Sequence, residues 1–242
     1  MRPYLAQVPG ARAAMQALRR ARKMFTSPGY REARRLLRTG RVGLFQPHNT
    51  TRPDRYPELF GWLGETFAAA PAPRILSFGC STGEEIVAIK SRLPRAQVTG
   101  VDINRGNLIE AATKTRPFGD SVRLAEANSL HGEPADGYDA ILCLTVLMNR
   151  RLGVERRSDC GDLLPFAQFE AAVADIARCV TPGGYLVIHS SNFRFCDTAA
   201  FARFTPTAFQ PPLRSDPAPL FGPDNRHQPG AVYRDAIFRK LH

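Results

Sequence analysis

The chain has 242 residues, of which 43% are hydrophobic and 23% are charged, which is typical of a soluble globular domain with an appendage. No apolar run approaches the roughly 18 residues needed to span a bilayer, so we expect neither a transmembrane helix nor a signal peptide. The five cysteines are scattered without a C-x-x-C pair, which argues against a zinc site or a disulfide framework and favours a reducing, cytoplasmic location. The five histidines are also widely separated, so the sequence predicts no metal site.

The net charge of +11 is concentrated in the first part of the chain. Residues 1–41 contain ten arginines and one lysine against a single glutamate, whereas the remainder is close to neutral. Two helices are predicted here, over residues 11–24 and 29–38, with a break at Ser27-Pro28-Gly29. Such an arm could bind an acidic membrane, RNA or an acidic protein, and we favour a solvated lid over a ligand cleft.

Residues 74–90, RILSFGCSTGEEIVAIK, predict a buried strand, a tight loop over residues 79–83 and a helix that begins at Glu84. The glycines at both ends of the loop allow a ligand to approach the main chain, and the helix start presents unpaired N–H groups to it. A second short strand, residues 97–102, ends in an acid. Asp102 is therefore placed to accept hydrogen bonds from the two hydroxyls of a ribose.

The loop sequence discriminates between nucleotide ligands. Ser81 stands where a dinucleotide fold has the middle glycine of G-x-G-x-x-G, and Glu84 and Glu85 follow directly. A pyrophosphate would meet two carboxylates there, which is electrostatically unfavourable. A ligand with an adenosine, a cationic amino-acid end and no phosphate suits the loop better, and S-adenosylmethionine is such a ligand.

The remaining elements alternate between helices and strands, which predicts a Rossmann-like, doubly wound, seven-stranded, mostly parallel sheet with an antiparallel last strand and the ligand at its carboxyl edge. A short basic helical arm precedes the sheet. We assign residues 1–48 to this arm and residues 49–242 to the domain that contains the sheet. The further elements are expected as helices at 56–69, 104–114 and 166–180 and as strands at 121–126, 138–144, 185–189 and 232–240, with a turn at 181–184.

On these motifs the chain resembles the class I S-adenosylmethionine-dependent methyltransferases, and within them it is most similar to the chemotaxis receptor methyltransferases, which are protein-glutamate O-methyltransferases. The similarity covers about residues 49–240. GCSTGEE matches the first motif of that family, and LCLTVLMNR matches its FCRNVLIYF segment, with Leu144-Thr145 in place of Arg-Asn. Further matches are Asn49, Thr51 and Arg55 in the segment that reaches over the cofactor, Asn128-Ser129 beside the adenine, PGGYLVIHSS at 182–191 and FRK at 238–240.

The resemblance implies methyl transfer from S-adenosylmethionine, with Arg55 gripping the cofactor carboxylate or holding an anionic acceptor as a catalytic residue. The cofactor-binding residues that it implies, together with those read from the loop, are Asn49, Thr51, Arg55, Gly79, Cys80, Ser81, Gly83, Glu85, Asp102, Ile103, Asn128, Ser129, Leu144 and Thr145.

The acceptor is left open between a protein carboxylate and a small molecule. A carboxylate needs only positioning, whereas a carbon or phenolic acceptor needs a base, for which Asp139, His131, Tyr138 and His189 are candidates by rough location. Because the Leu144-Thr145 pair departs from the family motif, a non-catalytic S-adenosylmethionine-binding protein remains an alternative. Because the arm is basic, an RNA-directed methyltransferase or an acidic partner of the arm is a further alternative. The oligomeric state is not predicted.

Overall fold

A computed structural model describes residues 11–39, 45–46, 51–212 and 218–242 of the chain. The expected boundary at residues 48 and 49 and the predicted ligand residue Asn49 lie outside the described residues.

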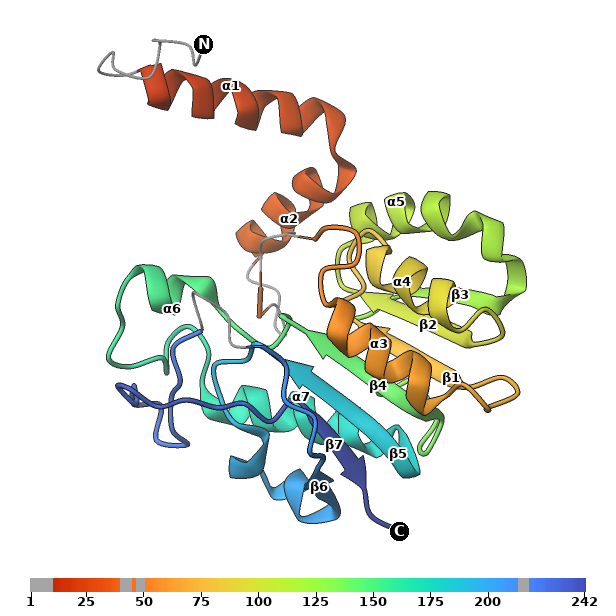
Figure 1. Ribbon diagram of the computed structural model, residues 1–242. Coiled ribbons are helices and arrows are strands. Elements are labelled where there is room, and N and C mark those ends of the chain that lie inside the picture. Colours follow the sequence, from red (N-terminus) through yellow and green to blue (C-terminus); the bar gives the residue numbers. More distant parts are fainter. Residues whose placement is uncertain (1–10, 40–44, 47–50, 213–217) are drawn as a thin grey trace.

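The centre of the molecule is a seven-stranded sheet with the strand order β3-β2-β1-β4-β5-β7-β6 (Figure 1). The first five strands pair in parallel, and β7 is antiparallel to both of its neighbours, so the predicted doubly wound sheet with an antiparallel last strand is confirmed. The strands are β1 (Arg74–Phe78), β2 (Gln97–Asp102), β3 (Val122–Glu126), β4 (Tyr138–Leu144), β5 (Val180–His189), β6 (Phe204–Pro206) and β7 (Ile237–Lys240).

Two strands differ from the sequence prediction. The expected turn at residues 181–184 lies within β5, because Tyr138 of β4 already pairs with Val180 across a register shift. The last strand begins only at Ile237, and the residues expected before it, 232–236, are irregular. Pairing with β5 sets the shorter strand, since this pairing begins at Ile237 and continues through Phe238 to Arg239.

Helices cover both faces of the sheet (Figure 1). On one face α3 (Pro57–Thr66), α4 (Glu84–Arg92) and α5 (Arg105–Thr115) contribute Phe60, Ile86 and Leu108 to one apolar cluster. On the other face α7 (Phe166–Arg178) contributes its buried stripe to a second cluster. Shorter elements are α6 (Arg150–Val154), η2 (Arg116–Ser121), η3 (Phe195–Asp197) and η4 (Ala199–Arg203).

The basic residues near the start of the chain form α1 (Ala11–Thr26) and α2 (Pro28–Thr39). The two helices meet at Ser27, whose hydroxyl accepts a hydrogen bond from the Tyr30 N–H, and the side chain of Arg31 donates to the last carbonyls of α1. α2 packs against α5 near the carboxyl ends of the strands, whereas α1 extends away from the sheet (Figure 1).

Candidate functional site

A pocket lies at the carboxyl edge of the sheet, where β1, β2 and β4 end and where α2 approaches from outside. Parallel strands bring their carboxyl ends to one edge, so residues far apart in sequence meet there. The lining residues are Ala33, Leu36, Phe45, Gln46, Thr51, Arg55, Phe78, Gly79, Ser81, Glu85, Val101, Asp102, Ile103, Asn104, Asn107, Ala127, Asn128, Leu144, Thr145, Val146 and Arg150.

The floor of the pocket is the loop after β1. Gly79 has a φ of 76°, and a Cβ atom at this position would lie 2.3 Å from Cγ2 of Val146, so both backbone angle and space require glycine. The N–H groups of Gly79 and Cys80 donate to the carbonyl of Val101, at 2.7 and 3.0 Å, which ties the loop to β2. The loop ends at Gly83, whose φ of 89° forms the left-handed N-cap of α4.

The carboxylate of Asp102 is held rigidly at the end of β2. One oxygen accepts from the Ser81 N–H at 2.8 Å, and the other accepts from the Asn104 N–H at 2.7 Å and from the Asn107 side chain at 3.5 Å. Burial raises the pKa of Asp102, and the backbone hydrogen bonds oppose this rise by favouring the carboxylate. The result is a fixed acceptor group facing the pocket.

The twin glutamates at the start of α4 have different environments. Glu84 forms an ion pair with Lys114 and accepts a hydrogen bond from Thr82, and it does not line the pocket. Glu85 lines the pocket, is partly buried and accepts a hydrogen bond from Ser77 at 2.8 Å. Burial raises the pKa of Glu85 to about 8, so a nearby cation would favour its ionised form.

A second polar group lies where β4 ends. Thr145 has a φ of 63°, and its N–H donates to the carbonyl of His189 at 2.7 Å. The hydroxyl of Thr145 shares a short hydrogen bond with the hydroxyl of Tyr56, whose ring also packs edge-on against the His189 ring, at 5.0 Å between centroids. The guanidinium of Arg55 lies over the Tyr56 ring at 5.1 Å. These contacts fix the backbone and side chains at one side of the pocket.

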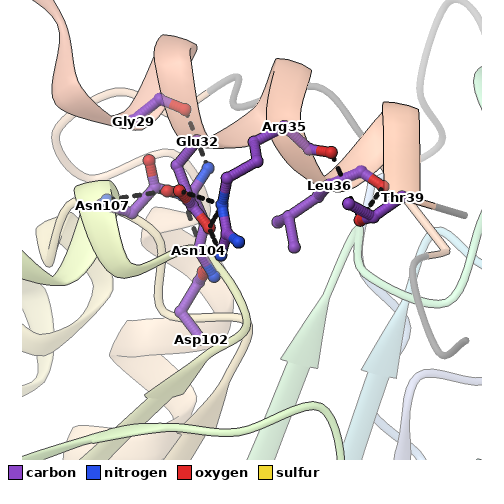
Figure 2. A network of polar contacts seen from close by, with 8 residues as sticks. All are labelled: Gly29, Glu32, Arg35, Leu36, Thr39, Asp102, Asn104 and Asn107. Atoms are coloured by element: carbon purple, nitrogen blue, oxygen red, sulfur yellow. Dashed lines mark hydrogen bonds and ion pairs between the residues drawn. The ribbon is translucent and has the colours of Figure 1, made fainter. Parts of the chain in front are cut away.

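The pocket is closed on its outer side by α2, which contributes Ala33 and Leu36. The helix approaches α5 so closely that a Cβ atom on Gly106 would lie 2.3 Å from the carbonyl carbon of Pro28. Figure 2 shows the side chain of Asn104, at the start of α5, donating to the Gly29 carbonyl of α2 at 2.9 Å. Because Asn104 also donates its N–H to Asp102, one residue joins the lid helix to the pocket acid.

Gln46 lines the pocket, and its side-chain oxygen is buried. This oxygen has no hydrogen-bond partner among the described residues. An orphaned buried acceptor is unfavourable unless a ligand or solvent donates to it. Together with the glycine-bounded floor and the two buried acids, it fits an adenosine-containing ligand that carries amino groups.

Comparison with known proteins supports this interpretation of the site. Residues 76–186 match the family model described as "Methyltransferase domain". This segment contains most of β1, all of β2, β3 and β4, most of β5, the glycine-bounded loop and Asp102. The part of the chain that forms the floor of the pocket is thus similar to methyltransferase domains.

The curated relatives that match the chain are also methyltransferases. A demethylmenaquinone methyltransferase of Thermus thermophilus is 31% identical over 116 residues, which cover 48% of this chain and 46% of the relative. A second, from Deinococcus radiodurans, is 27% identical over 133 residues, covering 53% and 48%. The chain thus spans about half the length of these relatives.

Among solved structures, the N-methyltransferase NodS from Bradyrhizobium japonicum, in complex with S-adenosyl-L-homocysteine, matches with a TM-score of 0.49 and 18% identity over 77% of this chain and 87% of that chain. The family model and the curated relatives support a similarity to methyltransferases, and neither shows the narrower resemblance to the chemotaxis receptor methyltransferases.

Residues 76–186 and the segments beside them bring most predicted ligand residues to one pocket. Those that line it are Thr51, Arg55, Gly79, Ser81, Glu85, Asp102, Ile103, Asn128, Leu144 and Thr145. Gly83 lies outside the lining and caps α4, Cys80 is buried beneath the loop, and Ser129 does not line the pocket. Burial also raises the pKa of the Cys80 thiol well above its usual range, which argues against a nucleophilic role.

Three of the four candidate bases lie away from the pocket. Asp139 accepts a hydrogen bond from the Arg74 N–H at the opposite, amino edge of the sheet, and Tyr138 lies next to it. His131 is exposed, and its Nδ1 atom lies 3.3 Å from a carboxylate oxygen of Asp175. Only His189 lies at the carboxyl edge, and it reaches the pocket through Tyr56 and Thr145 rather than lining it.

Several residues in or beside the pocket were missed by the sequence predictions. Tyr56 lies just before a helix and gives no motif, and Asn104 reads only as a helix cap. The apolar lid residues Ala33 and Leu36 carry no chemical signal at all. Among the described residues there is no group of three or more His, Cys, Asp or Glu side chains arranged to hold a metal ion, and none of the helices described is both long and apolar enough to cross a bilayer.

Proposed function

We propose that the protein is an S-adenosylmethionine-dependent methyltransferase that binds its cofactor in the pocket at the carboxyl edge of the sheet. The observation that carries the proposal is the carboxylate of Asp102, fixed by Ser81 and Asn104 beside the glycine-bounded loop. When bound, S-adenosylmethionine supplies a methyl group whose bond to the sulfonium sulfur breaks as the acceptor attacks.

Two acids of the chain would hold the two ends of this cofactor. Asp102 would accept hydrogen bonds from the ribose hydroxyls, for which its position at the end of β2 is suited. Glu85 would face the ammonium group, because a buried carboxylate with a raised pKa gains most from a cationic partner. The orphaned oxygen of Gln46 offers a further acceptor for a ligand amino group.

The end of the pocket beside β4 would position the acceptor. Methyl transfer is an in-line displacement, so the main requirement is close approach and alignment. The hydroxyl of Thr145 lines the pocket and is held by Tyr56, so it would orient an acceptor hydroxyl by hydrogen bonding. His189 supports Tyr56 from behind and is thus a positioning residue in this proposal.

The proposed acceptor is an apolar small molecule rather than a protein carboxylate. The lining of the pocket includes Leu36, Phe45 and Val146, which suit an apolar ring or chain. The matched relatives are named demethylmenaquinone methyltransferases, so a demethylated quinol is the example to try first. The cations Arg55 and Arg150 also line the pocket and keep a carboxylate acceptor as the alternative.

The decisive experiment measures binding and turnover together. Calorimetry should detect S-adenosylhomocysteine binding and little NAD binding, and labelled S-adenosylmethionine should transfer its methyl group to a quinol rather than to a glutamyl peptide or RNA. Asp102→Ala should weaken binding by about 1.5–3 kcal/mol through the loss of hydrogen bonds to a charged group. Asp139→Ala, at the opposite edge of the sheet, is the matched control.

The outcomes separate the alternatives. Tight NAD binding without a response to S-adenosylhomocysteine would refute the proposal, and binding without transfer to any acceptor class would indicate a non-catalytic cofactor-binding protein. Transfer to the peptide or to RNA would replace the acceptor and leave the cofactor assignment in place. A cytoplasmic location remains part of the proposal and rests on the free thiols of the described cysteines.

Arg55 has its own test. The neighbouring acid Asp54 pairs with Arg92 at 2.9 Å, while Arg55 lines the pocket. Arg55→Lys keeps the charge but loses the planar fork, so turnover or cofactor affinity should fall while the melting temperature of the ligand-free protein stays nearly constant. Wild-type binding and transfer in both Arg55→Lys and Arg55→Ala would remove this residue from the active site.

A further inference from the structure

The helix α1 carries an exposed apolar stripe. Met15, Leu18 and Phe25 follow one another at helical spacing on one side, with Arg22 between them. Leu18 is 76% exposed and Phe25 is 85% exposed. Large apolar side chains aligned in this way, rather than scattered singly, indicate a surface that binds a partner.

The other residues that the structure describes do not cover this stripe. α1 extends away from the sheet, and its carboxyl end is fixed to α2 because Arg31 donates to the carbonyls of Met24 and Phe25 at 3.0 and 3.1 Å (Figure 1). On the other side of the helix, the ammonium group of Lys23 lies over the ring of Tyr30 in α2, at 6.0 Å. Lys23 thus faces α2 while the apolar stripe faces away from that contact.

The charge of the arm narrows the choice of partner. Residues 1–41 carry ten arginines and one lysine against one glutamate, so a second copy of the same arm would be repelled. Nucleic acid would satisfy the charge but would leave Leu18 and Phe25 exposed. An anionic membrane surface satisfies both, because it attracts basic residues to its headgroups and accepts apolar side chains at the acyl boundary.

We propose that α1 is an interfacial helix that binds an anionic membrane surface, with Leu18 and Phe25 inserted and the basic residues at the headgroups. Arg22 lies within the apolar stripe and reaches the headgroups by extending its side chain along the helix. The binding itself does not depend on the proposed methyl transfer.

The proposal also gives the pocket an orientation. α2 continues directly from α1 and lines the pocket with Ala33 and Leu36. A membrane-bound α1 would therefore hold the lid helix close to the lipid surface. This deepens the proposed function, on which it rests, by assigning the membrane as the source of an apolar acceptor.

Vesicle co-sedimentation of the full chain tests the binding step. The protein should bind vesicles of phosphatidylcholine with phosphatidylglycerol, bind pure phosphatidylcholine weakly, and be released by high salt. The double variant Leu18→Ser and Phe25→Ser should bind the anionic vesicles at least about tenfold more weakly, because two inserted side chains are lost. Val154→Ser with Val232→Ser is the matched control, since these valines are 81% and 67% exposed outside the arm.

Each other outcome contradicts the proposal. Equal binding to neutral vesicles, or wild-type binding by the double variant, would overturn it. A concentration-dependent dimer in light scattering that the double variant abolishes would assign the stripe to a second copy instead. S-adenosylhomocysteine binding, measured on the same samples, should be unchanged in the double variant, so failure of the docking and failure of the cofactor proposal are distinguishable.

Discussion

The helices α1 and α2 follow one another in the chain and share a basic composition, yet they have opposite environments. Leu36 of α2 is 1% exposed and lines the pocket, whereas Leu18 of α1 is 76% exposed. The difference comes from one contact, in which Gly29 and Gly106 let α2 and α5 approach closely enough for Asn104 to bind the Gly29 carbonyl.

This contrast shows that an amphipathic pattern does not choose the partner of a helix. Both helices have an apolar side and an excess of arginines, and of the two only α2 contains a glycine, Gly29, which lies where it meets the backbone of α5. The first therefore keeps its apolar side for a partner outside the chain. The predictions below test whether α2 belongs to the pocket and α1 does not.

The largest effect is expected from Leu36→Ala. Truncating a buried leucine costs about 2–5 kcal/mol, and here the loss falls on the docking of α2 over the pocket. Affinity for S-adenosylhomocysteine should drop and protease cleavage within α2 should become faster. Leu37→Ala is the matched control, because Leu37 is the next residue and is 53% exposed. Equal effects of the two substitutions would show that α2 is not docked as described.

Gly106→Ala should act next most strongly. The new methyl group would lie 2.3 Å from the Pro28 carbonyl carbon and 2.5 Å from the Gly29 nitrogen, and these backbone atoms cannot rotate away. Overpacking of this kind costs about 1–3 kcal/mol, so calorimetry should again report weaker ligand binding. Gly61→Ala provides the control, since nothing lies within 4 Å of a Cβ atom there. Wild-type affinity in Gly106→Ala would argue against the helix crossing.

Asn104→Ala should have a smaller effect on the same contact. The substitution removes the cap of α5, in which the Asn104 side chain accepts from Asn107, and the bond to Gly29. Loss of an N-cap costs about 1 kcal/mol. Chemical denaturation and ligand binding should both show this loss, whereas Asn104→Ser should retain a cap and lose the bond to α2 without adding a charge beside Asp102. If Asn104→Ser binds ligand as well as the wild type, the bond to α2 is dispensable.

The pKa of Glu85 reports how well the pocket is closed. Burial raises this pKa from 4.5 to about 8. Between about pH 4.5 and pH 8, Glu85 therefore keeps its proton in the folded state and has lost it in the unfolded state. The contribution of Glu85 to stability should be complete below about pH 4.5 and decline as the pH rises to 8. Urea unfolding of Glu85→Gln should show a weaker pH dependence over this window. In Gly106→Ala, an opened pocket should lower the pKa of Glu85, so the decline in stability should occur at lower pH. Removal of α1 should leave the pH dependence of stability unchanged.

The smallest effect is expected from deletion of residues 1–26, which removes α1 and leaves α2 in place. Melting temperature and S-adenosylhomocysteine affinity should match those of the full chain, because α2 and the sheet supply the described contacts of the pocket. Binding to anionic vesicles should be lost at the same time. A truncated chain that unfolds or no longer binds ligand would show that α1 also supports the body.

The sequence alone determined the sheet and the floor of the pocket. Continuous apolar strands, the glycines at 79 and 83 and the acid at 102 are local signals, because strand burial and positive backbone angles restrict the residue types that fit. The strand boundaries near residues 181 and 232 were wrong, since pairing with a neighbouring strand, rather than local propensity, sets where a strand begins and ends.

Only the tertiary structure decided the sides and the lid of the site. Glu84 and Glu85 are adjacent and identical in sequence, and the packing of α4 turns one toward Lys114 and buries the other in the pocket. Tyr56 and Thr145 are 89 residues apart and meet because β4 ends beside the start of α3. Such contacts depend on distances across the fold, and no local pattern of side chains encodes them.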